Sequence, residues 1–225
     1  MVKRILSSGC SYVRHSFDKE NPNRANQGDS PTRPLTQEHD HVSCIVLENE
    51  TNFTIEAGEK MKIPTICFGE PGSGNRYAIY KVIDYVEKNL KNIHDFDATF
   101  FIIGVTEFTR FDIVRPSYHL SNWPRLPIEE YAKYYDRKDS EFEIKSLLKL
   151  FTLYLNSKNI PHIFINTMNN VVSIKDIVPT FIFPNGSEYW RTYIKSYDST
   201  YKGEHPNIAD HKILAKLITN KLEVL

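Results

Sequence analysis

The run ATFFIIG at residues 98–104 is almost continuously apolar. Such a run is typical of a central parallel strand that helices cover on both faces. Shorter apolar runs, which we interpret as further strands, lie at Val2–Ser7, Ile63–Phe68 and Ile160–Ile165. Helical spacing of apolar residues marks three further segments, at residues 76–90, 129–155 and 207–222. Strands that alternate with helices predict an α/β fold built on a parallel sheet.

A chain of 225 residues suits one α/β domain, and we expect a single domain over residues 1–225. Three parts of it lack a clear period and are interpreted as loop insertions, near residues 16–40, 111–126 and 168–200. Residues 42–47 have the pattern of a short helix. The aromatic insertion at 168–200 is long, and long irregular segments are often functional.

Charge and cysteine content argue against several functions. Lys plus Arg and Asp plus Glu both number 28, so no net charge attracts nucleic acid or an anionic membrane. No apolar run approaches the roughly 20 residues that span a bilayer, and the N-terminus resembles a strand rather than a signal peptide. Three cysteines without metal-ligand spacing indicate free thiols in a reducing, cytoplasmic compartment. We expect neither cofactor nor metal, and the sequence does not indicate an oligomeric state.

A serine and a histidine near opposite ends of the chain form the candidate catalytic pair. Ser11 follows the first predicted strand, on the edge where ligands of parallel sheets collect. Because a free alcohol is a poor nucleophile, it needs a base, and His205 at the opening of the last helix is the candidate. The backbone N–H groups of Gly72 and Ser11, with the Thr106 hydroxyl, are candidate donors to an oxyanion.

Four short motifs follow one another along the chain: GCS at 9–11, PG at 71–72, GVTE at 104–107 and HP at 205–206. In this order they resemble the four sequence blocks of the SGNH (GDSL-type) hydrolase superfamily. The resemblance implies a flavodoxin-like, three-layer α/β/α fold and ester hydrolysis without a cofactor. It makes Ser11 the nucleophile, Gly72 an oxyanion donor and His205 the base. Compact variants of this kind are common among proteins of tailed phages, for which the location would be the host cytoplasm.

The chain departs from the family pattern at two functional positions. Thr106 stands where the family has an oxyanion-donating Asn, and Lys202 where it has the acid that orients the histidine. Asp198 and Glu204 are the remaining candidate acids, and a serine–histidine dyad without an acid is the alternative. The departures also favour a second hypothesis, a binding or structural module of this fold whose catalytic set has decayed.

Polar residues near the predicted edge are candidates for binding a small-molecule or carbohydrate ester. Arg110 and Glu107 follow the third strand, although an ion pair between them is an equal interpretation. Asn75 is a further candidate and is also interpreted as the cap of the next helix, whereas His211 is interpreted as structural and bonded to a neighbouring loop. Carbohydrate O-acetyl esters are suggested by family analogy. Four aromatic residues are candidates for stacking on sugar rings, namely Tyr118, Trp123, Tyr189 and Trp190.

Overall fold

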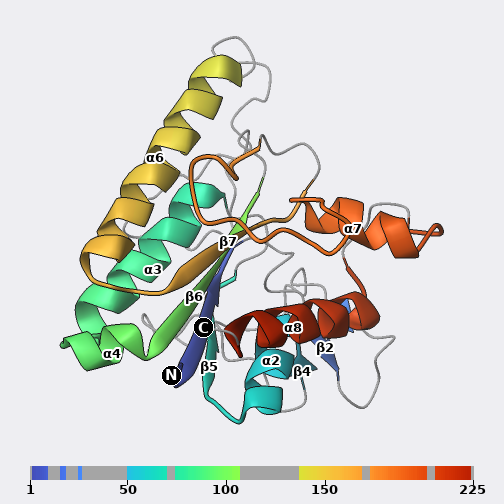
Figure 1. Cartoon of the computed structure of the whole chain (residues 1–225), viewed down its shortest axis with the longest axis horizontal. Coiled ribbons are helices and arrows are strands. Elements are labelled where there is room, and N and C mark those ends of the chain that lie inside the picture. The colour runs from blue at the N-terminus through green and yellow to red at the C-terminus, as the bar shows by residue number, and fades with distance from the viewer. Residues whose placement is uncertain are drawn as a thin grey trace.

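The computed structural model describes residues 2–9, 16–18, 25–26, 50–69, 74–106, 137–168, 173–201 and 206–223. The main sheet has four parallel strands in the order β5-β1-β6-β7 (Figure 1). These strands are β5 (Thr65–Cys67), β1 (Arg4–Ser8), β6 (Thr99–Val105) and β7 (His162–Asn166). A small antiparallel sheet in the order β3-β2-β4 consists of β3 (Ala25–Asn26), β2 (Ser16–Asp18) and β4 (Glu50–Thr51). The parallel sheet that the sequence predicts is confirmed.

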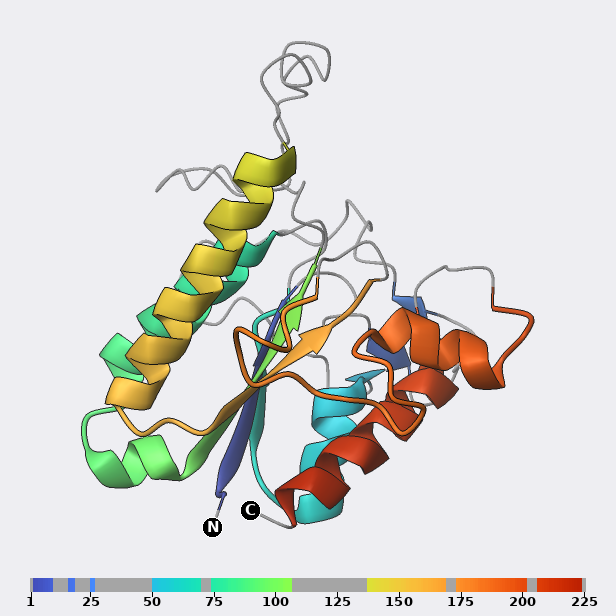
Figure 2. The ribbon, with the colours of Figure 1, turned by 45° about the horizontal axis from the view of Figure 1, so that its top comes forward.

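Helices cover both faces of the main sheet, so the fold has the three layers that the family resemblance implies (Figure 2). One face is covered by α3 (Asn75–Asn89) and α6 (Arg137–Ser157), and the other by α2 (Phe53–Met61) and α8 (Ile208–Leu222). Two shorter helices complete the described elements, α4 (Ile93–Asp97) and α7 (Trp190–Tyr197).

The four parallel strands all end at the same edge of the sheet. β1 lies between β5 and β6, and its Leu6 pairs with Ile66 on one side and Phe101 on the other. The start of β1 and the end of α8 both lie at the opposite edge (Figures 1 and 2). The carboxyl edge is therefore assembled from segments that are far apart in the sequence.

The central strands are buried on both faces. All seven residues of β6 are buried, as its apolar run predicts, although the strand continues past Gly104 to Val105. β1 ends in two buried serines that find partners on opposite sides of the sheet. The Ser7 and Thr54 hydroxyls lie 2.7 Å apart on the α2 side, and the Ser8 hydroxyl donates to the Ala78 carbonyl of α3 at 2.9 Å. These bonds allow polar side chains in a core strand, because buried polar groups need partners.

Helix α2 has no counterpart among the helices expected from the sequence. Its N-cap is Asn52, whose side chain accepts hydrogen bonds from the backbone N–H groups of Thr54 and Ile55 at 2.9 and 3.2 Å. Phe53 and Ala57, four residues apart, are both buried. The cap and this spacing are the sequence signals for the helix. The short helix expected at 42–47 lies outside the described residues.

The segment 173–201 is not the irregular loop that the sequence suggests. It contains α7, and part of it runs beside β7, where the backbone N–H of Phe181 donates to the Phe164 carbonyl at 2.8 Å. Trp190 is only 1% exposed. Its ring meets that of Phe53 edge-on with centroids 5.8 Å apart. The prediction that Trp190 stacks on a sugar ring is therefore wrong, because the ring is in the core.

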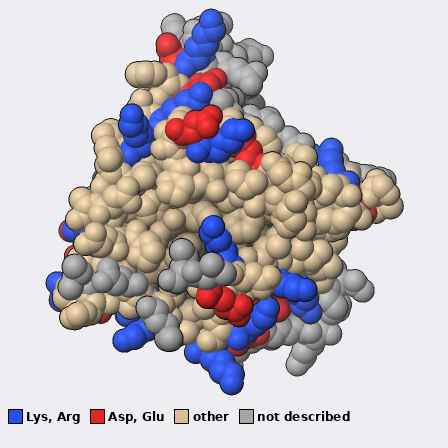
Figure 3. Space-filling model, viewed as in Figure 1, with Lys and Arg blue, Asp and Glu red and all other residues tan. Residues whose placement is uncertain are grey.

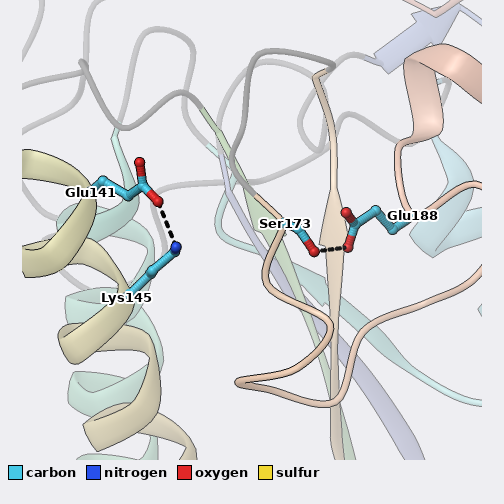
Figure 4. Close-up of polar contacts among 4 residues, drawn as sticks. All are labelled: Glu141, Lys145, Ser173 and Glu188. Atoms are coloured by element: carbon cyan, nitrogen blue, oxygen red, sulfur yellow. Dashed lines mark hydrogen bonds and ion pairs between the residues drawn. The ribbon is translucent and has the colours of Figure 1, made fainter. Parts of the chain in front are cut away.

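Figure 4 shows two local polar contacts, one in the segment before α7 and one on α6. Ser173 donates to Glu188 at 3.0 Å and so joins the two sides of the chain that precedes α7. Glu141 and Lys145 form an ion pair along α6. This helix begins at Arg137 among the described residues, within the helical pattern expected over 129–155.

On the face seen in Figure 3, positive and negative side chains are interspersed rather than gathered by sign. Among the described residues, no helix combines the length and the apolar character needed to cross a membrane. The same residues contain no cluster of three or more His, Cys, Asp or Glu side chains that would hold a metal ion.

Candidate active site

At the carboxyl edge of the main sheet, β1 ends three residues before Ser11 and β6 ends directly before Thr106. Of the residues predicted to take part in catalysis or to bind the ester through polar groups, three are described, namely Asn75, Thr106 and Asp198. The others of this set lie outside the described part of the chain, as do the aromatic candidates Tyr118 and Trp123; they are Ser11, Gly72, Glu107, Arg110, Glu204 and His205. The structure therefore describes the elements from which these residues extend, and their roles stay predictions.

The end of β1 and the start of α8 are both bonded to the start of α2. Ser7 of β1 contacts the Thr54 hydroxyl, and the backbone N–H of the neighbouring Phe53 donates to His211 Nδ1 at 3.2 Å. The His211 ring also stacks on the Phe53 ring, with centroids 5.8 Å apart. His211 is thus a buried structural residue, as the sequence suggests, and because its Nδ1 accepts, the neutral ring carries its proton on Nε2.

The first turn of α8 is fixed by a capping box. Asp210 Oδ2 accepts from the Asn207 N–H at 2.7 Å, and the Asp210 N–H donates to Asn207 Oδ1 at 3.1 Å. This reciprocal pairing satisfies two backbone donors that a helix start leaves open. Pro206, directly before the cap, is buried. The capping box therefore fixes the start of α8, which lies directly after Asn207.

A hydrogen bond between α7 and α8 joins the two ends of the segment that carries His205. Tyr197, the last residue of α7, donates its hydroxyl to Asp210 Oδ1 at 2.6 Å. Burial raises the pKa of the Asp210 carboxyl, although the bond from Tyr197 works in the opposite direction. Burial and then the bond to Asp210 raise the pKa of Tyr197, so its hydroxyl stays protonated and able to donate.

Asp198, one candidate acid, lies immediately after α7. Its Oδ1 accepts from the backbone N–H of Thr200 at 2.9 Å and from the Thr200 hydroxyl at 2.6 Å. These bonds lower the pKa of Asp198, so the group is ionised at neutral pH. The arrangement orients the carboxylate within its own turn. A contact between Asp198 and His205 remains a prediction.

Thr106 and Asn75 bind each other at the junction of β6 and α3. Asn75 Nδ2 donates to the Thr106 carbonyl at 3.1 Å, and the Thr106 N–H donates to Asn75 Oδ1 at 2.9 Å. The Thr106 hydroxyl lies 3.8 Å from Met168 Sδ. Asn75 is not the helix cap expected from the sequence, because the N-cap of α3 is Gly74. The Asn75 amide instead joins the start of α3 to the end of β6.

Asn166 is a residue of this edge that the sequence analysis did not identify. It is the last residue of β7, pairs with Val105 of β6 and is fully buried. Neither Nδ2 nor Oδ1 of its amide has a hydrogen-bond partner among the described residues. In the sequence it is one of several asparagines at 166–170, and only strand pairing places it beside the end of β6.

A scan against protein-family models and a search of curated proteins gave no match. Three solved structures are similar to this chain. A protein described as lipolytic and of the G-D-S-L family, from Desulfitobacterium hafniense DCB-2, is 10% identical with a TM-score of 0.49, over 97% of this chain and 98% of that one. A carbohydrate esterase, whose active site is described as displaying divergent catalytic and non-catalytic binding functions, is 13% identical with a TM-score of 0.49. That match covers 99% of this chain but 65% of the esterase.

The third structure is a protein described as a GDSL-like lipase, from Parabacteroides merdae ATCC 43184. It is 11% identical with a TM-score of 0.43, over 100% of this chain and 99% of that one.

Proposed function

We propose that this protein is a serine hydrolase that cleaves an ester, with Ser11 as the nucleophile and His205 as its base. The main support is that β1 and α8 are both bonded to the start of α2. Ser11 lies four residues beyond Ser7, which contacts α2, and four residues extend at most about 14 Å. His205 lies six residues before His211, which bonds to the same helix start. The two segments therefore leave from neighbouring points of the fold.

In the proposed reaction, the His205 imidazole takes the proton of the Ser11 hydroxyl as its oxygen attacks the ester carbonyl. The N–H groups of Gly72 and Ser11 donate to the oxyanion of the tetrahedral intermediate. When the intermediate collapses, the alcohol leaves with the proton that His205 returns. Water, deprotonated by His205, then releases the acid from the acyl enzyme and restores the serine. No cofactor takes part in these steps.

An acid that orients His205 would be Asp198 or Glu204. The lowered pKa of Asp198 suits this role, because the group is ionised where a protonated imidazole would need a counter-charge. Substituting each residue separately distinguishes them. We expect kcat to fall by orders of magnitude in only one of the variants Asp198→Asn and Glu204→Gln, the one that removes the acid bonded to the imidazole. An unchanged kcat in both variants supports a serine–histidine dyad.

The proposed substrate is a carbohydrate O-acyl ester, with acetyl as the acyl group. This class rests on the family resemblance, with Glu107 and Arg110 as candidate contacts to sugar hydroxyls. Of the two described aromatic candidates, Tyr189 keeps this proposed role, because it is only partly buried whereas Trp190 is in the core. Burial and a hydrogen bond to Glu188 raise its pKa to about 12, so its hydroxyl stays protonated.

A fluorophosphonate probe, which reacts with activated serines, tests the mechanism directly. We expect labelling of the folded wild type, none after denaturation, and none in Ser11→Ala. Ser199→Ala, which removes an exposed serine hydroxyl, is the matched control and should label as the wild type does. Release of acetate from glucose pentaacetate, measured for the same variants, tests the substrate class.

The alternative function is a binding module that keeps the fold without the reaction. Two observations favour it: Lys202 occupies the usual position of the acid, and Thr106 stands in place of the oxyanion-donating Asn, with its hydroxyl 3.8 Å from Met168 Sδ. If the folded wild type is not labelled by the probe and releases no acetate, this alternative replaces the hydrolase.

A further inference from the structure

The carboxyl edge contains two buried asparagines in opposite hydrogen-bonding states. The Asn75 amide uses its oxygen and its nitrogen on the backbone of Thr106. The Asn166 amide, which is fully buried, uses neither on any described residue. Burying an amide without partners is costly, and most buried polar side chains in folded proteins have at least one partner. Asn75 thus has an evident structural role, whereas Asn166 does not.

Strand geometry places the Asn166 side chain on the side of the sheet that α3 and α6 cover. Phe164, two residues earlier on β7, meets Phe151 of α6 edge-on with ring centroids 6.2 Å apart. Because side chains two residues apart on a strand point to the same face, Asn166 also faces this layer. Its pairing partner Val105 directly precedes Thr106, which is bonded to the first residue of α3. The free amide therefore lies one strand away from the start of α3.

The start of α3 would favour a negative charge at this place. The N-cap is Gly74, which offers no side chain to the open N–H groups, and the first turn contains no acidic residue. The partial positive charge of a helix start is therefore not offset by an acid of its own first turn. The Asn166 amide and the start of α3 lie on the same face of the sheet. The amide can donate a hydrogen bond and the helix start has a partial positive charge, so both would stabilise an oxygen that becomes negative.

We propose that Asn166 donates a hydrogen bond from Nδ2 to the carbonyl oxygen of the ester as that oxygen becomes an oxyanion. This inference rests on the proposed hydrolase function and adds a donor from β7. Thr106 is less suited, because its N–H is bonded to Asn75 and its hydroxyl lies against Met168. Asn166 would then be buried without a partner among the described residues because its partner is the substrate.

The proposal predicts a variant that gains stability and loses reactivity. Asn166→Leu keeps the shape of the side chain but removes the unpaired amide, so Tm should rise by roughly 2–6 °C. The rate of labelling by the fluorophosphonate probe should fall by about 10²–10³-fold, as for other lost oxyanion donors. Asn166→Ala, which also removes the donor, should lose labelling to the same extent whatever its stability.

Thr152→Val is the matched control. The Thr152 hydroxyl on α6 is also buried without a hydrogen-bond partner among the described residues, but it is not at the carboxyl edge of a strand. This variant should gain stability and keep the labelling rate of the wild type. Asn75→Leu should instead lower Tm, because it leaves two backbone groups of Thr106 unpaired.

The outcomes separate this inference from the function on which it rests. If the wild type is labelled and both Asn166 variants are labelled at the same rate, Asn166 is not a donor but the hydrolase stands. A lower Tm for Asn166→Leu would mean that the amide has a structural partner, which also overturns the inference. If the wild type is not labelled at all, the hydrolase and the inference fail together.

Discussion

Tyr197→Phe tests whether the bond between α7 and α8 positions the segment that carries His205. The substitution removes only the hydroxyl that donates to Asp210 at 2.6 Å. A hydrogen bond to a charged group contributes about 1.5–3 kcal/mol. Because Tyr197 is 43% exposed, water replaces part of the bond, and we expect a loss of about 1–2 kcal/mol of unfolding free energy. For a protein of this size, that loss lowers Tm by roughly 2–8 °C.

The loss should depend on pH in a defined direction. Burial raises the pKa of Asp210 above its ordinary 3.8, and the bond from Tyr197 lowers it. A group whose pKa is raised by folding stabilises the protein fully at pH values below its unfolded-state pKa. This stabilisation is lost as the pH rises through the pKa of the folded state. Removing the Tyr197 hydroxyl raises the pKa of Asp210 in the folded state further, so the variant loses more stability than the wild type as the pH rises. The difference between wild type and variant should therefore be largest near pH 7 and shrink near pH 4.

Urea unfolding at both pH values measures this difference, and the probe-labelling rate reports on His205. We expect Tyr197→Phe to slow labelling about tenfold at saturating probe, because the segment between the two helices is less well held. Tyr193→Phe is the control, because it removes a hydroxyl from the same helix and keeps the ring that contacts Phe183 and Tyr197. An equal loss of stability at both pH values, or equal effects of the two substitutions, would refute the reasoning.

Three further predictions concern stability. Gly58→Ala should lower the free energy of unfolding by about 1–3 kcal/mol, because a Cβ there would lie 2.1 Å from Thr65 Cγ2 and 2.8 Å from the Ile63 carbonyl oxygen. In urea unfolding, adding Thr65→Ser should restore part of this loss. A Gly58→Ala variant as stable as the wild type would contradict the crowding. His211→Phe should cost about 1–3 kcal/mol, because the buried Phe53 N–H loses its acceptor; an unchanged urea midpoint would argue against that bond. Burial lowers the pKa of His162 below 6.5, so the stability it contributes above that value is lost as pH falls. His162→Gln should make the unfolding free energy fall less steeply between about pH 7 and 5 than it does in the wild type. Equal slopes for the variant and the wild type would contradict this prediction.

The elements that were predicted well are those whose pattern is local. β6 is recognisable because a strand covered on both faces must be apolar at every position, and its seven residues are all buried. α8 was expected over 207–222 and runs over Ile208–Leu222, because its start has a capping residue and its apolar residues keep a helical period. The structural role of His211 was also predicted correctly.

The elements that were missed depend on contacts between distant segments. α2 has only nine residues, and Gly58 in its middle is unfavourable for a helix on intrinsic propensity. That glycine is needed because Thr65 and the Ile63 carbonyl lie too close for a Cβ. Trp190 was expected at a ligand-facing surface because its neighbours in the sequence have no period. It is buried because α2 and α8 present Phe53 and His211 to its ring.

Periodicity along the chain was thus enough to predict the parallel sheet and the helices that cover it. It was not enough to assign roles to two asparagines of the same type. Asn75 is satisfied because the end of β6, 31 residues later, brings both backbone groups of Thr106 to its amide. The Asn166 amide has no partner among the described residues, because the pairing with Val105 uses the backbone and none of those residues brings a polar group to the side chain. Hydrogen-bond satisfaction depends on which distant groups the folded chain brings within about 3 Å, and no local pattern encodes this.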